Sequence, residues 1–300
     1  MGSVAFLFQL RLEPKDEFDW EAHKSIDALA NVLKDSALEE SFLAGIKKRG
    51  ILFSFEFWRL LCNRDILEKA RNYALEEMQK VANSCGEWRS MYCSANNEHA
   101  HESAKRNILR TATSCWDWHW MLRRLPVSEH AFVISKMKKL AKSFHDFDIL
   151  RESVSKDSEE YRYALSGMKS TAQSFDQWQR LRIYADESDY PLIIQKMHDT
   201  AITLYNLHSL WEYSGTYPEI RSTTWKRMRD GSFAFSKWQS LYTLYSTKYQ
   251  PEIENLCLEK MKETASSLED WSALHEVAKN NPEVRSYAIK MIAKLSTDCE

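Results

Sequence analysis

Large apolar residues recur along the chain at a spacing of about 30 residues. We use one residue of each repeat as its anchor, and the anchors are Met78, Ile108, Met137, Met168, Met197, Met228, Met261 and Met291. Four residues before each anchor stands a second residue that is usually apolar, as at Ala74 and Ala104. Because residues four apart share one face of an α-helix, the pattern predicts a helix, here called helix A, around each anchor.

A second helix, helix B, is predicted after each anchor. Apolar residues stand seven, ten and thirteen residues past the anchor, as at Phe175, Trp178 and Leu181, and these offsets form one stripe of a helix. The middle position holds a large apolar residue in each repeat: Trp88, Trp118, Phe147, Trp178, Leu207, Trp238 and Trp271. Since five of the 11 tryptophans fall at this position, we assign them to the core and not to a binding surface.

Polar residues mark the helix starts. A hydroxyl residue six positions past the anchor, followed three positions later by an acid or amide, matches a capping box at the start of helix B, as at Ser114 and Asp117. Ala234 breaks this rule and predicts a differently capped start in its unit. Pro-Glu pairs that begin at Pro218, Pro251 and Pro282 predict starts of helix A, because proline suits the first helical position.

These patterns predict an all-α chain built from about eight two-helix units of ~30 residues. Residues 39–300 are interpreted as the repeat array and residues 1–38 as an N-terminal helical cap with an amphipathic helix at 20–33. Residues 44–61 fit loosely as an earlier unit. The last unit lacks helix B, because the sequence stops three residues after Thr297. We therefore expect the chain to be part of a longer repeat protein.

The segment from Asn281 to Met291 resembles the first helix of a HEAT-like repeat, with an Asn-Pro start, Val-Arg, and then small and large apolar residues. Pro218-Glu219-Ile220-Arg221 repeats this opening. Over residues 40–300 the resemblance is one of architecture, that is, of repeated helix pairs. It implies a right-handed α-α superhelix whose inner face binds an extended partner. The large aromatic residue in helix B departs from the family pattern.

Charge and cysteine usage narrow the class of protein. A net charge of -2 gives no general attraction for nucleic acid or anionic lipid, and apolar runs are shorter than the ~20 residues of a membrane span. The 6 cysteines show no paired CxxC spacing, so we expect reduced thiols and a cytoplasmic location. The sequence gives no indication of the oligomeric state.

The sequence shows no recognisable catalytic or metal motif. It contains no nucleophile elbow, phosphate-binding glycine loop or HExxH pattern, so we expect neither enzymatic activity nor a cofactor. Cys85, Cys93, His99 and His101 lie close together along the chain, but their spacing matches no zinc finger or knuckle, and Cys85 occupies a core position. We therefore expect no metal.

Candidate partner-binding residues occupy the surface side of helix B. Offsets of about eleven, twelve and fifteen from the anchor collect Arg89, His119, Trp120, Arg123 and Arg180, with Tyr184 and Tyr213 as further candidates. The first five fall in the units anchored at Met78, Ile108 and Met168, which we interpret as neighbours forming one surface stripe. Arginine and exposed indole favour a non-catalytic scaffold that binds an extended or acidic segment of a protein. The alternative is a HEAT-like nucleic-acid-binding protein, with a DNA glycosylase-like module as one form of it.

Overall fold

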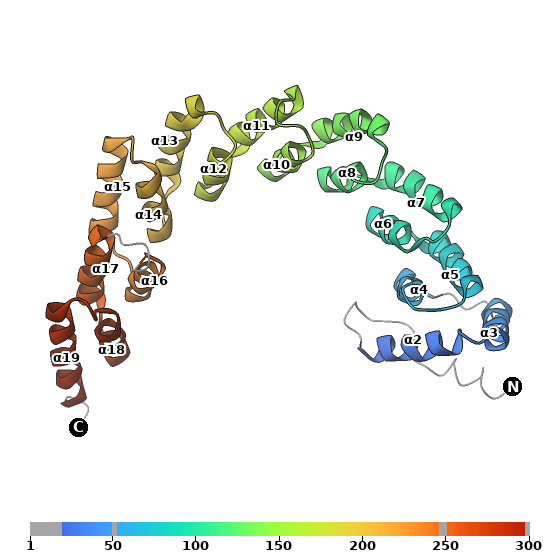
Figure 1. Ribbon diagram of the computed structural model, residues 1–300, viewed down its shortest axis with the longest axis horizontal. Helices are drawn as coiled ribbons and strands as arrows, with labels where there is room; N and C mark the ends of the chain where they lie inside the picture. The colour runs from blue at the N-terminus through green and yellow to red at the C-terminus, as the bar shows by residue number, and fades with distance from the viewer. Residues whose placement is uncertain (1–19, 50–52, 246–250, 298–300) are drawn as a thin grey trace. The chain divides into compact units, whose positions relative to one another are not determined.

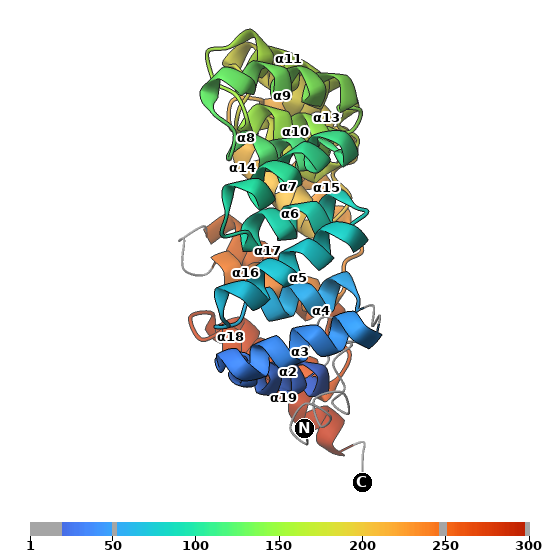
Figure 2. The same cartoon turned by 90° about the vertical axis from the view of Figure 1, so that its right-hand side faces the viewer.

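The structure of the chain is a computed structural model that describes residues 20–49, 53–245 and 251–297 (Figure 1). Within these residues the chain forms 18 α-helices, one short 3-10 helix and no strand, which confirms the predicted all-α class. The chain divides into two compact units, residues 1–141 and 142–300, and each is described by itself. Figure 2 shows the helices of the N-terminal unit, from α2 to α9, stacked in chain order.

The helices follow the predicted alternation. Helices A are α5 (Glu68–Val81), α7 (Glu98–Thr111), α9 (Val127–Leu140), α11 (Glu159–Thr171), α13 (Tyr190–Thr200), α15 (Pro218–Asp230), α17 (Pro251–Thr264) and α19 (Pro282–Thr297). Helices B are α6 (Cys85–Ser94), α8 (Cys115–Leu122), α10 (Phe144–Glu152), α12 (Phe175–Arg182), α14 (Leu204–Tyr213), α16 (Phe235–Tyr245) and α18 (Leu268–Val277). α4 (Phe55–Cys62) is the helix B of the earlier unit, and the remaining helices are α2 (Trp20–Val32), α3 (Ser36–Arg49) and η1 (Glu187–Asp189).

The repeated apolar positions form the core. The anchors from Met78 to Met261 are fully buried, and the large residue of each helix B from Trp88 to Trp271 is at most 8% exposed. Three positions at the C-terminal end depart from the pattern: Leu268 is 43% exposed, Tyr287 is 39% exposed, and Met291 is half-buried.

The most extensive contacts join each helix B to the helix A that follows it. The pairs are α4 with α5, α6 with α7 and α8 with α9 in the N-terminal unit, and α10 with α11 through α18 with α19 in the C-terminal unit. Contacts between helix A and the following helix B, such as α5 with α6, are smaller. In the structure, the closely packed pair is therefore a helix B with the helix A that follows it. The sequence unit, in contrast, begins at helix A.

One hairpin shows how closely the two helices approach. A Cβ atom placed on Gly167 of α11 would lie 2.3 Å from Cδ1 of Phe147 on α10, which is well inside van der Waals contact. The Phe147 ring also meets the Tyr163 ring edge-on at a centroid distance of 6.0 Å. A side chain at Gly167 would have to displace the ring of Phe147, so this hairpin depends on a glycine at its contact.

The predicted caps are present at most helix starts. Reciprocal capping boxes begin α6, α8, α10, α12 and α18, in each case with the serine that the sequence predicted. Pro218, Pro251 and Pro282 are the first residues of α15, α17 and α19, as predicted. Before α16 the Ala234 side chain offers no acceptor, and the Lys237 and Trp238 amides donate to the Ala234 carbonyl.

The capping carboxylates should make stability depend on acid pH. Burial alone would raise the pKa of Asp117 and Asp146, but hydrogen bonds from Ser114 or Ser143 and from backbone amides lower both values. A carboxyl with a depressed pKa in the folded state stabilises above its unfolded pKa, and this stabilisation is lost as the pH falls through the folded value. We expect the thermal midpoint to fall between neutral pH and about pH 3 and to fall less in Asp117→Asn and Asp146→Asn.

The neutral capping residue Gln177 of α12 provides the matched control. Gln177→Ala should lower the midpoint by a similar amount at neutral and acid pH, because no proton binds there. If the thermal midpoint falls as much in acid in the two aspartate variants as in the unaltered chain, the carboxylates of Asp117 and Asp146 are not the source of the acid dependence.

Candidate functional site

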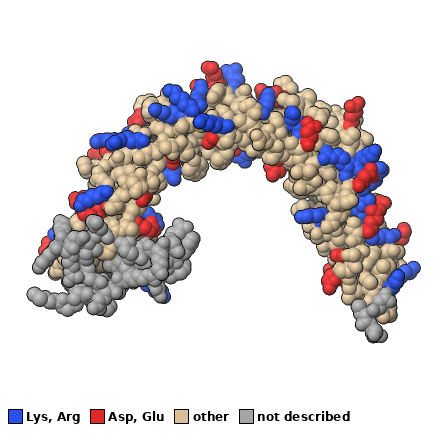
Figure 3. Space-filling view, turned by 180° about the vertical axis from the view of Figure 1, so that it is seen from behind, with Lys and Arg blue, Asp and Glu red and all other residues tan. Residues whose placement is uncertain are grey.

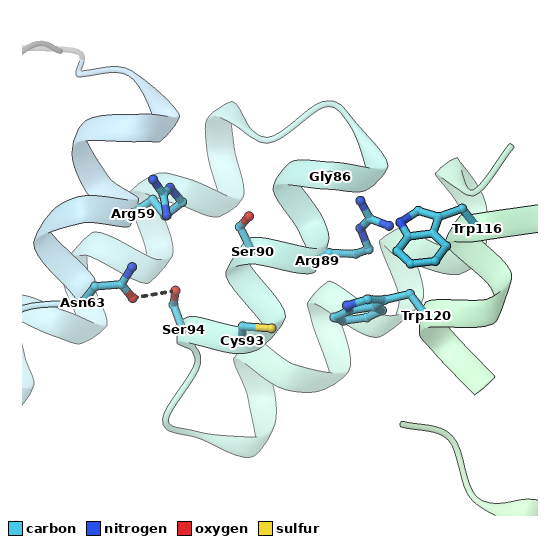
Figure 4. A pocket seen from close by; sticks show the side chains of 9 residues that line it. All are labelled: Arg59, Asn63, Gly86, Arg89, Ser90, Cys93, Ser94, Trp116 and Trp120. Carbon is cyan, nitrogen blue, oxygen red and sulfur yellow. Dashed lines mark hydrogen bonds between the residues drawn. The ribbon is translucent and has the colours of Figure 1, made fainter. Parts of the chain in front are cut away.

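An open groove crosses three consecutive B-type helices of the N-terminal unit, and we call it the tryptophan groove (Figure 4). Its volume is about 320 Å³. It is lined from α4 and its end, from α6 and from α8 by Arg59, Asn63, Gly86, Arg89, Ser90, Cys93, Ser94, Trp116 and Trp120. The capping boxes of α6 and α8 fix where these helices begin and therefore which side chains face the groove.

Two tryptophans of α8 form one side of the groove. Trp116 is 53% exposed, and its ring stacks on His119 at a centroid distance of 5.7 Å. Trp120 is half-buried and meets the Tyr92 ring edge-on at 5.6 Å. The guanidinium of Arg124 lies 3.7 Å from the Trp120 ring centroid. Trp120 is therefore held in place by its neighbours, whereas Trp116 presents an open face to solvent.

Arg89 of α6 reaches toward both tryptophans in Figure 4. Its guanidinium carbon lies 5.9 Å from the Trp120 ring centroid, and its Nη1 lies 3.3 Å from Oδ1 of Asp117. Burial alone would raise the pKa of Asp117, but hydrogen bonds from Ser114, from the Cys85 thiol and from backbone amides lower it. Asp117 is therefore ionised at neutral pH and forms an ion pair with Arg89, and it is not itself part of the groove lining.

The other side of the groove is polar. Arg59 of α4 donates from Nε to Glu56 Oε2 at 2.7 Å, and Ser94 Oγ donates to Asn63 Oδ1 at 3.2 Å. The exposed thiol of Cys93 points toward Trp120 in Figure 4. The groove thus combines an open indole face with two arginines and several neutral hydrogen-bonding groups.

The structure brings two of the predicted site residues together. Arg89 and Trp120 come together in the tryptophan groove, and Arg123 is exposed at the C-terminal end of α8 but does not line it. The prediction that His119 lies on the surface is wrong, because its side chain is 6% exposed and covered by Trp116. Offset eleven faces the neighbouring helices in this unit and not the solvent.

Arg180 belongs to a different environment in the C-terminal unit. Its guanidinium binds Asp148 Oδ2 through Nε at 2.5 Å and Glu152 Oε1 through Nη2 at 3.1 Å. The stripe hypothesis treated the units anchored at Ile108 and Met168 as neighbours, but the unit anchored at Met137 lies between them and contributes these two acids. Arg180 is therefore paired within the C-terminal unit, and the units that were taken to form the stripe are not all consecutive.

Tyr184 and Tyr213 also contact arginines within the C-terminal unit. The guanidinium carbon of Arg151 lies 3.6 Å from the Tyr184 ring centroid. The guanidinium carbon of Arg182 lies 4.1 Å from the Tyr213 ring centroid, and Gln179 Nε2 donates to Tyr213 Oη at 3.1 Å. Both rings are half-buried. Their predicted role in partner binding stays a prediction.

Arg59 and Trp116 are two of the seven groove residues that were not predicted as binding residues. Arg59 stands eleven residues after Lys48, as Arg89 does after Met78, so extending the register to the earlier unit would have found it. Trp116 stands eight residues after its anchor, on the first turn of helix B opposite the core stripe. The helical periodicity that places Trp118 in the core also places Trp116 on the exposed side, so this signal could have identified it.

Charge is mixed on the face that Figure 3 displays. Patches of Lys and Arg lie among patches of Asp and Glu on both units, and large areas between them are uncharged. Among the described residues no three His, Cys, Asp or Glu side chains are grouped so that they could hold a metal ion. His101, one of the four residues of the zinc pattern, has its Nε2 atom 2.9 Å from the Ala95 carbonyl oxygen.

Comparison with known proteins adds no family. No protein-family model matches the sequence, and a search of curated proteins finds no match. Within the described ranges, no helix is both long enough and apolar enough to span a membrane.

Proposed function

We propose that the chain is a non-catalytic scaffold whose helix B surface binds an extended, acidic segment of a partner protein in the tryptophan groove. The observation that carries the proposal is the groove lining, which contains two tryptophans and two arginines, and no acidic side chain among the described residues that line it. Aromatic and arginine side chains supply much of the binding energy at protein interfaces. The planar guanidinium also suits carboxylates, which favours an acidic segment.

The same proposal includes a right-handed HEAT-like winding of the helix pairs and a cytoplasmic location. The Pro-Glu starts of α15 and α19 and their Ile-Arg or Val-Arg continuation support the first. The buried thiols support the second, because burial raises the pKa of Cys62 and Cys257 to about 12 and keeps them neutral and unreactive.

Nucleic-acid binding is the second candidate, and the exposed ring of Trp116 beside arginine supports it, since such a platform also stacks bases. One feature weighs against it. On the face that Figure 3 displays, Lys and Arg are interspersed with Asp and Glu, in place of a continuous basic track. Binding to a phosphate backbone relies on such a track.

Ser90 gives a direct test because it lines the groove and its hydroxyl forms no hydrogen bond with another residue in the described ranges. We expect labelled peptides rich in Asp, Glu and Leu to bind the full chain in fluorescence anisotropy, and Ser90→Glu to weaken binding about tenfold or more by repelling them. Trp116→Ala should weaken binding to a similar extent. The measurement is made at physiological ionic strength and repeated with a single-stranded oligonucleotide.

Ser90→Gln is the control of matched size, and it should leave the affinity within about twofold, since no charge is introduced. If Ser90→Glu and Ser90→Gln bind alike, the groove is not the acidic-peptide site. Tighter binding of the oligonucleotide, with an affinity that falls steeply with salt, would favour the second candidate.

A further inference from the structure

A second groove lies in the C-terminal unit between the first turn of α14 and one face of α16, and we call it the apolar groove. Its volume is about 500 Å³. It is lined by Ile202, Thr203, Leu204, Tyr205, Phe233, Lys237, Ser240, Leu241 and Leu244. Unlike the tryptophan groove, it is lined mainly by aliphatic and aromatic side chains.

Three of these side chains are unusually exposed. Ile202 is 81% exposed, Leu244 is 54% exposed and Tyr205 is 52% exposed. Single exposed apolar residues are common on protein surfaces, but these three converge on one groove. Removing apolar side chains from water is favourable, so a ligand that covers all three together gains binding energy.

The groove is held by buried and hydrogen-bonded neighbours. Leu204 and Leu241 are buried beneath it, and Phe233 meets the Trp238 ring edge-on at a centroid distance of 5.7 Å. Thr203 Oγ1 accepts the Asn206 amide at 3.1 Å and fixes the start of α14. The shape is therefore present before a ligand arrives, which lowers the entropic cost of binding.

Hydrogen bonds from α15 stabilise the turn before α14. Arg227 donates from Nη1 to the His198 carbonyl at 2.8 Å and from Nη2 to the Ala201 carbonyl. These contacts hold the backbone just ahead of Ile202. Ile202 consequently projects from a fixed turn and not from a free loop.

Lys237 is the one charged residue among the described residues that line the apolar groove, and it is exposed. Its ammonium group forms no ion pair with any residue in the described ranges, and α16 contains no acidic residue. A ligand that fits this lining therefore offers aliphatic groups and one anionic group. A carboxylate beside leucine-type side chains has this chemistry.

The arrangement of the groove residues on α16 favours a peptide over an acyl chain as the ligand. Lys237, Ser240, Leu241 and Leu244 follow one stripe of the helix, which extends about 10 Å along the surface. An extended chain of about three residues spans this length, and its alternate side chains can enter the groove while its backbone stays in water. An acyl chain gains most from an enclosed cavity, whereas Ile202 at the rim is largely open to solvent.

We propose that the apolar groove binds a short segment of a partner protein that carries two neighbouring large aliphatic side chains and one carboxylate. The aliphatic side chains cover Ile202, Tyr205 and Leu244, and the carboxylate pairs with Lys237. This site is independent of the tryptophan groove and does not rest on the function proposed for it.

The test uses an array of labelled peptides in which two leucines and one aspartate are placed at all short spacings in a Ser-Gly background. A subset should bind the full chain, and Ile202→Glu and Leu244→Glu should each weaken its binding about tenfold or more. Lys237→Glu should reverse the preference, so that peptides with lysine in place of aspartate bind better. Ile183→Glu is the matched control, because Ile183 is 67% exposed in the same unit but outside the groove.

The proposal is overturned if no peptide of the array binds the chain. It is also overturned if the groove variants bind the peptides with the same affinity as Ile183→Glu. It is also overturned if sodium oleate displaces the peptides and binds more tightly, which would make the groove a lipid site. Self-association that disappears in Leu244→Glu would instead assign the groove to a second copy of the chain. Ser90→Glu should leave this binding unchanged, so the two grooves are tested separately.

Discussion

Replacing Trp238 with alanine should lower the free energy of unfolding by roughly 3–5 kcal/mol, as expected when a buried aromatic side chain is deleted. Trp238 is fully buried on α16, and the Phe233 ring packs against its edge. Its Nε1 has no hydrogen-bond partner among the described residues, so the loss would come from packing alone. Urea denaturation followed by far-UV circular dichroism gives the measurement.

Trp178→Ala should behave in the same way, because Trp178 occupies the same repeat position on α12 and is 5% exposed. Trp116→Ala provides the contrast, since more than half of that side chain is in water. It should change stability by less than about 1 kcal/mol. Equal midpoints for Trp238→Ala and Trp116→Ala would contradict the core assignment of the repeat.

The second large effect is expected at Asp148. Its carboxylate binds Arg151 through Nε at 2.9 Å and Nη2 at 2.7 Å, and it also binds Arg180. The side chains of Asp148 and Arg151 are each 8% exposed. Asp148→Ala removes the buried counter-ion of the Arg151 guanidinium and leaves the exposed Glu152 as its acidic partner. Loss of one partner of a buried ion pair typically costs about 3–5 kcal/mol.

Glu152→Ala is the control within the same cluster. Glu152 binds Arg151 and Arg180 at 3.0 and 3.1 Å, but its side chain is 45% exposed. The loss there should stay below about 1 kcal/mol, because water replaces the missing carboxylate. A loss in Asp148→Ala no larger than in Glu152→Ala would show that water reaches the cluster.

The buried positions of the repeat were predictable because each helix repeats one pattern of contacts with its neighbours. A residue such as Trp178 or Met168 has the same surroundings in successive units, so its periodicity reveals its burial. The helix starts were predictable for a similar reason, since Ser174 and Gln177 cap α12 through local hydrogen bonds. Both features depend on interactions within a unit or with an equivalent next unit.

Surface contacts were less predictable because they depend on which side chains differ between units. His119 has a polar side chain at an offset where Arg89 is partly exposed, yet the ring of Trp116 covers it. Arg180 is paired because the unit before it offers Asp148 and Glu152. Such pairs join specific residues of different helices, and the period alone does not indicate them.

The closer association of each helix B with the following helix A identifies the piece that behaves as a module. A deletion that removes α6 together with α7 takes out one intact hairpin, and its ends both lie at capped connectors before a helix B. A deletion of α5 together with α6 would instead separate α4 and α7 from their closest neighbours. Shortening or lengthening of this protein, in the laboratory or during gene duplication, should therefore proceed in steps that begin at the serine before helix B.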